Sequence, residues 1–259
     1  MYSKKPLILV SNDDGITSLG IRTLVELMQE LGEVVVVAPD SPQSGMGHAI
    51  TIGEPLRLHA TDIFENVAAY ECSGTPADCV KLGKHYVLKD RTPDLVVSGI
   101  NHGSNSSISV LYSGTMSAAI EAAIEGIPAI GFSLCDFVAN ADFSHTKSYI
   151  LQIVKGVLEN GLPKGVALNV NFPKKSNEAI GGIKICRQTN GKWQEAFEKR
   201  KDPHGRSYFW MSGNFVNYDE GQEDTCEWAL KHNFVSVVPC QYDMTSHSTI
   251  QLMQQWSLD

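Results

Sequence analysis

The chain has 259 residues, of which 42% are hydrophobic and 19% charged, an ordinary balance for a globular protein with one sizeable core. Its formal net charge of -8 argues against stable binding of long nucleic acids, because such binding depends on basic surfaces. No apolar run approaches the roughly 20 residues of a membrane-spanning helix, and the run after Pro6 is too short for a secretory signal. The 6 cysteines include no C-x-x-C pair. These features predict a cytoplasmic protein without a membrane partner.

Strand and helix patterns alternate from the start of the chain. Residues 6–10 are typical of a buried strand, and residues 19–31 carry apolar side chains at helical spacing. The run at 34–38 (Val-Val-Val-Val-Ala) is typical of a central parallel strand that is covered on both faces. Residues 50–71 have a weaker, alternating pattern that favours a hairpin.

The alternation continues through about residue 172. Thr75 and Pro76 have the residue types of an N-cap and a first helical position, so they predict a helix start. The further elements are a helix over 75–87, a strand over 94–97, a helix over 115–125, a strand over 128–134, a helix over 146–158 and a strand over 166–171. This rhythm predicts a doubly wound α/β fold with a mostly parallel sheet.

After Pro173 the pattern changes. Residues 183–186 and 207–211 look like strands on either side of a polar segment, without a helix between them. A helix, a strand and a closing helix follow at 224–231, 234–239 and 249–256. We therefore predict one domain overall: a catalytic core over 1–173, a protruding β-hairpin arm for oligomerisation or closure over 174–222, and a return to the core over 223–259.

Three polar loops that contain glycine follow apolar runs in the first half of the chain. They are residues 11–15 (Ser-Asn-Asp-Asp-Gly), 40–45 (Asp-Ser-Pro-Gln-Ser-Gly) and 98–105 (Ser-Gly-Ile-Asn-His-Gly-Ser-Asn). Loops that leave the carboxyl ends of neighbouring parallel strands converge on one crevice. We therefore expect these loops to share a single site.

The side chains of these loops are suited to a hard metal ion. Asp13 and Asp14 could face one cation, with Ser44 and Asn101 as neutral partners. Oxygen ligands without cysteine favour Mg²⁺, Mn²⁺ or Ca²⁺ over zinc. The alternatives are an Asx turn for the aspartates and simple backbone hydrogen bonds for Ser44 and Asn101.

A helix entrance at 112–115 (Tyr-Ser-Gly-Thr) could hold a phosphate on its free N–H groups, helped by the hydroxyls of Ser113 and Thr115. Asn105 could also donate to an anion. The alternative is that Ser113 only caps the helix. None of these segments contains Lys or Arg, so the metal and backbone donors would have to neutralise a phosphoryl group.

Two histidines of the loop regions, His48 and His102, are the candidate proton carriers near neutral pH, although either could simply be solvated or cap a turn. His247 lies four residues after Asp243, and we interpret that pair as structural.

Ordered motifs over residues 7–135 resemble those of the SurE (survival protein) family of metal-dependent 5'/3'-nucleotidases. The matching blocks are 8–15 (Ile-Leu-Val-Ser-Asn-Asp-Asp-Gly), 37–40 with Ser44 and Gly45, 74–80 (Gly-Thr-Pro-Ala-Asp-Cys-Val), 93–101 (Pro-Asp-Leu-Val-Val-Ser-Gly-Ile-Asn) and 112–115. A weaker match resumes at 234–239 and 243–247. The family's usual Asn-Leu-Gly-Asp-Asp type stretch is replaced here by residues 105–109 (Asn-Ser-Ser-Ile-Ser).

The resemblance implies a Rossmann-like core that hydrolyses nucleoside monophosphates, as a homodimer or homotetramer built partly by exchanged C-terminal elements. It implies one divalent cation, Mg²⁺ or Mn²⁺, and two groups of site residues: the metal ligands Asp13, Asp14, Ser44 and Asn101, and the phosphate contacts Asn105, Ser113, Gly114 and Thr115. Asp13 and Asp14 are the catalytic candidates, and Asp13 is the best candidate for positioning the attacking water.

Rival functions remain on the same fold. A non-catalytic nucleotide-binding or assembly protein is the main alternative, because a helix entrance can hold phosphate without cleaving it. A nicotinamide-dependent oxidoreductase and a P-loop kinase are disfavoured, since the chain lacks G-x-G-x-x-G at its first loop and has no G-x-x-x-x-G-K-[ST].

Overall fold

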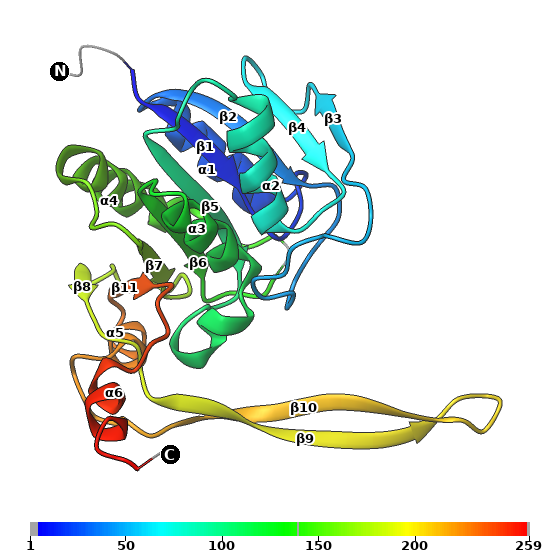
Figure 1. Cartoon of the computed structure of the whole chain (residues 1–259), viewed down its shortest axis with the longest axis vertical. Coiled ribbons are helices and arrows are strands. Elements are labelled where there is room, and N and C mark those ends of the chain that lie inside the picture. Colours follow the sequence, from blue (N-terminus) through cyan, green and yellow to red (C-terminus); the bar gives the residue numbers. More distant parts are fainter. Residues whose placement is uncertain (1–4, 139, 258–259) are drawn as a thin grey trace.

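The computed structural model describes residues 5–138 and 140–257, so predictions for residues 1–4, 139 and 258–259 lie outside the described residues. A nine-stranded sheet forms its centre, in the order β3-β4-β2-β1-β5-β6-β7-β11-β8 (Figure 1). Its strands are β1 (Leu7–Ser11), β2 (Glu33–Pro39), β3 (Leu58–Thr61), β4 (Ala68–Cys72), β5 (Leu95–His102), β6 (Ala129–Leu134), β7 (Val166–Phe172), β8 (Ile183–Ile185) and β11 (Val235–Gln241).

The strand directions define a mostly parallel sheet. The pairs β3 with β4 and β11 with β7 are antiparallel, whereas the other six neighbouring pairs of this sheet are parallel. The predicted α/β class with a mostly parallel sheet is confirmed, and so is the predicted hairpin in the 50–71 segment, which β3 and β4 form.

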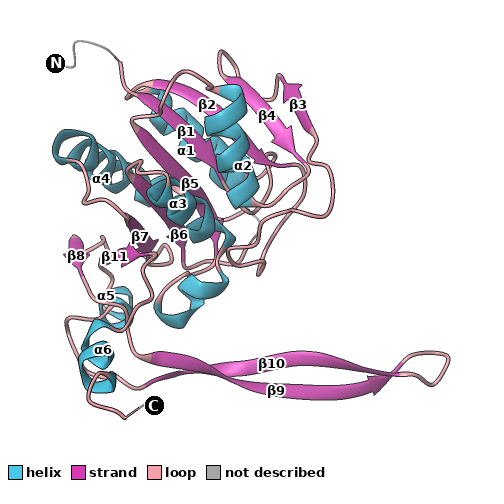
Figure 2. Ribbon diagram, viewed as in Figure 1, coloured by secondary structure: helices cyan, strands magenta, loops and turns pink. Residues whose placement is uncertain are grey.

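Helices cover both faces of the sheet (Figure 2). One apolar layer contains buried side chains of α1 (Leu19–Gln29) and α4 (Lys147–Asn160), and the other contains those of α2 (Pro76–Leu82) and α3 (Gly114–Ile124). Strand β1 supplies alternate side chains to the two layers, Ile8 and Val10 to the first and Leu7 and Leu9 to the second. Short helical elements complete the chain: η1 (Gly83–Val87), η2 (Ser107–Tyr112), η3 (Ser144–Thr146), α5 (Cys226–Lys231) and α6 (His247–Met253).

The start of α2 follows the predicted local chemistry. Thr75 Oγ1 accepts a hydrogen bond from the Asp78 N–H at 3.2 Å, the Thr75 N–H donates to Asp78 Oδ2 at 3.0 Å, and Pro76 takes the first helical position. The helix predicted over 75–87 is confirmed in extent, but it changes type: α2 ends at Leu82 and the chain continues to Val87 as the π-helical turn η1. This turn packs tightly on the sheet, since a Cβ at Gly83 would lie 2.9 Å from a methyl group of Leu9.

The protruding arm is a single antiparallel hairpin of β9 (Gly191–Lys201) and β10 (Ser207–Asn217) that extends away from the body (Figure 1). The hairpin form that the sequence pattern predicted for the arm is present, but the prediction of its first strand is wrong. The predicted strand at 183–186 corresponds to β8, which pairs with β11 in the main sheet. The polar segment after it forms β9 instead. Both faces of a free ribbon meet solvent, so β9 needs no apolar alternation and gave no strand signal.

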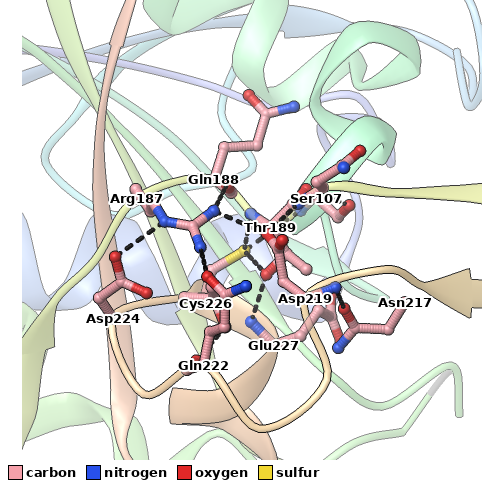
Figure 3. A network of polar contacts seen from close by, with 12 residues as sticks. Ser107, Arg187, Gln188, Thr189, Asn217, Asp219, Gln222, Asp224, Cys226 and Glu227 are labelled. Atoms are coloured by element: carbon pink, nitrogen blue, oxygen red, sulfur yellow. Dashed lines mark hydrogen bonds and ion pairs between the residues drawn. The ribbon is translucent and has the colours of Figure 1, made fainter.

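A polar network fixes the base of this arm to the body (Figure 3). The Arg187 guanidinium donates to Asp219 Oδ2 at 2.6 Å and to Asp224 Oδ2 at 2.8 Å, and it also bonds Gln222. Asp219 Oδ2 accepts a further hydrogen bond from the Asn190 N–H at 2.7 Å. The network therefore joins the chain that enters β9 to the chain that leaves β10.

Within the described residues, no helix is long and apolar enough to cross a membrane.

Candidate active site

The candidate site lies at the point where the strand order reverses. Strand β1 stands between β2 and β5, and the chain moves from β1 to β2 on one side before it later enters β5 on the other. The carboxyl ends of β1 and β5 therefore flank a crevice, where α/β sheets commonly bind ligands. The Gln43 N–H donates to Asp13 O at 2.7 Å, and the His102 N–H donates to Asp14 Oδ2 at 3.1 Å. These bonds bring the three polar loops together, as the sequence predicted.

Asp13 is buried against the first residues of α3. It is 4% exposed, and its Oδ1 accepts a hydrogen bond from Thr115 Oγ1 at 2.5 Å. A Cβ at Gly114 would lie 2.6 Å from the Cβ of Asp13, so this approach requires glycine there. Burial raises the pKa of the Asp13 carboxyl to about 6, against the hydrogen bond from Thr115, and the Asp14 charge raises it further. Binding of a proton, or of a cation in its place, is therefore favoured at this carboxylate.

Asp14 is braced by His102. Both the backbone N–H and the Nδ1 of His102 contact Asp14 Oδ2, at 3.1 and 2.9 Å, and the imidazole meets the Phe143 ring edge-on with 5.3 Å between centroids. These contacts fix one oxygen of Asp14 and leave Oδ1 available to a ligand. The predicted role of His102 as a proton carrier stays a prediction, whereas its contact with Asp14 is a feature of the structure.

Asn101 belongs to a strand and not to the predicted loop. Strand β5 continues to His102, past the predicted end at residue 97, and its register against β6 shifts between Ser98 and Asn101. The shift occurs at Gly99, where a Cβ would lie 2.3 Å from Phe132 O, so a bulged strand with glycine was mistaken for a loop. Asn101 Nδ2 donates to Gly103 O at 2.9 Å, which leaves its amide oxygen available to a cation.

Ser44 is exposed in the second loop, and its position is fixed through the preceding residue, Gln43, whose N–H bonds Asp13 O. Ser113 is the N-cap of α3, where its Oγ accepts a hydrogen bond from the Met116 N–H at 3.0 Å. The capping interpretation of Ser113 is therefore correct, and it leaves the N–H groups at the helix start as the anion donors of this segment.

Asn105 is held by polar side chains that are absent from the sequence-based prediction of the site. Asn105 Nδ2 donates to Ser133 Oγ, its backbone N–H donates to Asn171 Oδ1, and Asn169 Nδ2 donates to Asn105 O, each at 2.8 Å. The signal was present in the sequence, because two asparagines occupy same-face positions of the buried strand β7, where apolar residues are usual. Within the described residues no hydrogen bond joins Asn105 to residues 113–115.

His48 contacts Glu121 of α3, and within the described residues no hydrogen bond joins it to Asp13 or Asp14. Its Nε2 is 2.9 Å from Glu121 Oε2 on α3, and Lys81 Nζ is 2.6 Å from the other oxygen, Oε1. Burial alone would raise the pKa of Glu121, but the hydrogen bonds from His48 and Lys81 outweigh it and the pKa is lowered. The predicted structural pair of His247 and Asp243 is present on the surface, with 3.3 Å between Nε2 and Oδ2.

The donor set fits a hard divalent cation. Residues 5–138 and 140–257 contain no group of three or more His, Cys, Asp or Glu side chains that could hold a metal ion by themselves. A cation at this crevice would therefore combine Asp13 and Asp14 with neutral oxygens such as those of Ser44 and Asn101. Oxygen-only sets with few carboxylates suit Mg²⁺ or Mn²⁺. A cation would also offset the two effects that raise the pKa of Asp13, first the burial of its charge and then the repulsion by Asp14.

The fold and the crevice define an α/β protein with an acidic site at the switch point of a mostly parallel sheet. Residues 8–195 match the family model described as survival protein SurE. The chain is 70% identical over 253 residues to "5'-nucleotidase SurE" of Cytophaga hutchinsonii, with 97% of each chain covered. It is 62% identical to the protein of the same name from Christiangramia forsetii, with 100% of each covered. The chain belongs to the SurE family.

A solved structure agrees with this assignment. The crystal structure of the SurE protein from Aquifex aeolicus superposes with a TM-score of 0.82 at 40% sequence identity, covering 96% of this chain and 98% of that one. The predicted family resemblance is confirmed.

Proposed function

We propose that this chain hydrolyses nucleoside monophosphates to nucleosides and phosphate with one divalent cation, Mg²⁺ or Mn²⁺, held by Asp13, Asp14, Ser44 and Asn101. The chain is a phosphomonoesterase, since relatives 70% and 62% identical over nearly their whole length are 5'-nucleotidases by name. One contact supports the proposal above the others: the buried carboxylate of Asp13 packs on Gly114 and Thr115, so the proposed metal ligands and phosphate contacts meet there.

The side chains of the crevice divide the work in this proposal. A bound cation supplies Lewis acidity toward the phosphoryl group and the attacking water. Asp13 and Asp14 are the catalytic carboxylates, and Asp13 orients the water for in-line attack. Thr115 fixes the Asp13 carboxylate through its hydroxyl, and His102 fixes Asp14 through Nδ1.

The start of α3 holds the phosphate in this scheme. The N–H groups of Gly114 and Thr115 point along the helix toward its positive end, and Ser113 and Asn105 complete the set. Of the two candidate proton carriers we retain His102, because its ring contacts a catalytic carboxylate. His48 contacts Glu121 instead, so we assign it no proton transfer.

Phosphate release from AMP tests the function. We expect turnover with Mg²⁺ or Mn²⁺, its loss in EDTA and its return when the metal is restored. Asp13→Asn should lower kcat by at least about 100-fold, and Ser44→Ala should weaken metal dependence less severely. Asp40→Asn, an exposed carboxylate of the same edge, is the matched control and should keep the parent rate. Full AMP hydrolysis by Asp13→Asn would refute the assignment, and binding of AMP without turnover by the parent chain would favour the non-catalytic alternative.

We further propose a homodimer or homotetramer in the cytoplasm, with the arm and the C-terminal elements at the contacts. The arm exposes large apolar side chains along both strands, among them Phe197, Phe209, Trp210 and Met211. The cysteines of the described chain are all free, as suits a reducing compartment. Light scattering of a variant with Phe209→Ser and Trp210→Ser should show a smaller assembly, whereas an unchanged mass would contradict the role of the arm.

A further inference from the structure

The loop over residues 40–50, called the Ser44 loop below, is held to the body on both sides of its serine. Before it, the Gln43 N–H donates to Asp13 O at 2.7 Å. After it, His48 Nε2 lies 2.9 Å from Glu121 Oε2 on α3. Ser44 itself is exposed, and no hydrogen bond within the described residues involves its side chain. Its position therefore depends on the contacts of the loop around it.

Glu121 is an unusual residue for its place in α3. Its side chain is 3% exposed, among buried small residues such as Ala118 and Ala122. Its second oxygen, Oε1, accepts from Lys81 Nζ at 2.6 Å. Glutamate is seldom buried so fully unless it is paired, and apolar side chains in place of such a pair often leave stability unchanged or increase it. Stability alone therefore does not account for this carboxylate, whereas a fixed acceptor for His48 does.

Helix α3 thereby fixes two parts of the site relative to each other. Its first residue, Gly114, belongs to the proposed phosphate position, and Glu121 lies seven residues further, about 10 Å along the axis. The Gly47 N–H also donates to Tyr112 O at 3.2 Å, just before the helix begins. The helix that presents N–H groups to the phosphate therefore also holds the far side of the Ser44 loop.

We propose that His48 is a positioning residue of the metal site, whose bond to Glu121 holds the Ser44 loop so that the Ser44 hydroxyl reaches the cation. The inference rests on the proposed function, because it takes Ser44 to be a metal ligand. The carboxylate can only accept, so His48 Nε2 is the donor of this bond. His48 acts through the loop and takes no part in the reaction itself.

The next turn of α3 offers a matched control. Glu125 also binds one lysine and one histidine, with the Nζ of Lys84 at one oxygen and His85 Nε2 at 3.2 Å from the other. Both partners belong to η1, which contributes nothing to the proposed site. His85→Ala therefore removes the same kind of contact from the same helix and leaves the Ser44 loop untouched.

The test measures Mn²⁺ affinity by calorimetry, without substrate. His48→Ala should raise the Kd by about 3- to 10-fold, as for loss of one hydrogen bond, and by no more than Ser44→Ala does. His48→Gln keeps an N–H donor and should stay within about twofold of the parent. In a Ser44→Ala background His48→Ala should cause no further loss, because the loop then carries no side-chain ligand to position. His85→Ala should leave the Kd unchanged.

Amide hydrogen exchange in EDTA gives a second measure that requires neither metal nor turnover. Exchange over residues 43–50 should be faster in His48→Ala and unchanged in His85→Ala. A parent-like Mn²⁺ affinity in His48→Ala, or an equal loss with and without Ser44, would overturn the positioning role and leave the proposed function intact. An unchanged affinity in Ser44→Ala alone would overturn both this role and the metal ligands of the proposed function.

Discussion

Replacing Asp13 by asparagine should stabilise the metal-free protein while it removes activity. Burial raises the pKa of Asp13 from 3.8 to about 6. The carboxyl is still charged at neutral pH, but the charge is less favourable in the folded state than in the unfolded state. A shift of about 2 pH units corresponds to about 3 kcal/mol of lost stability. Asparagine removes that charge and still accepts the hydrogen bond from Thr115. Its own N–H groups need partners, which reduces the gain to a rise in Tm of about 3–8 °C.

The sign and the pH window follow from the raised pKa. The folded state binds the Asp13 proton more tightly than the unfolded state, so the penalty is fully present above about pH 6 and absent below the unfolded value of 3.8. At pH 5 about half of the Asp13 penalty should remain, and because the cost of the asparagine N–H groups does not change with pH, the variant should then melt only slightly above the parent or level with it. Mg²⁺ should reverse the order of the two melting temperatures at pH 8, because it binds the folded parent and not the variant.

Thermal unfolding in EDTA at pH 8, 6 and 5 measures this difference, with Asp40→Asn as the exposed control. A variant that melts at or below the parent at pH 8 would refute the reasoning that burial of this charge is costly. A difference that does not shrink toward pH 5 would show that its cause is something other than the Asp13 proton.

Three further predictions concern the contacts around the site. Mn²⁺ affinity measured by calorimetry should fall about tenfold per pH unit below pH 6, because a proton competes for Asp13, and a flat profile would contradict this. Gly114→Ala should lower the free energy of unfolding by about 1–3 kcal/mol and weaken Mn²⁺ binding, because the new Cβ meets Asp13. The control Gly156→Ala, in the open middle of α4, should slightly raise Tm. Equal effects of the two substitutions would contradict the close approach of Gly114 to Asp13. Arg187→Ala should loosen the base of the arm and speed proteolysis within 187–224, while unchanged cleavage would leave the network without that role.

Local sequence chemistry determined much of this protein. Apolar runs such as 34–38 can be stable only when buried on both faces, so they predicted central strands. The Thr75 and Pro76 pair marked a helix start because it acts on the nearest backbone groups. The positions of Asp13, Asp14 and Asn101 after apolar runs also predicted a shared crevice, since parallel strands bring their ends to one edge.

Tertiary packing decided the rest. The continuation of β5 through Gly99 depends on the approach of the Phe132 carbonyl, and the membership of β8 in the main sheet depends on β11, which follows about fifty residues later. Distant contacts likewise join His48 to Glu121 and seat Asn105 on β7. A sequence pattern reports which groups each residue can satisfy, but which partner is near enough to satisfy them is fixed only when remote segments pack together.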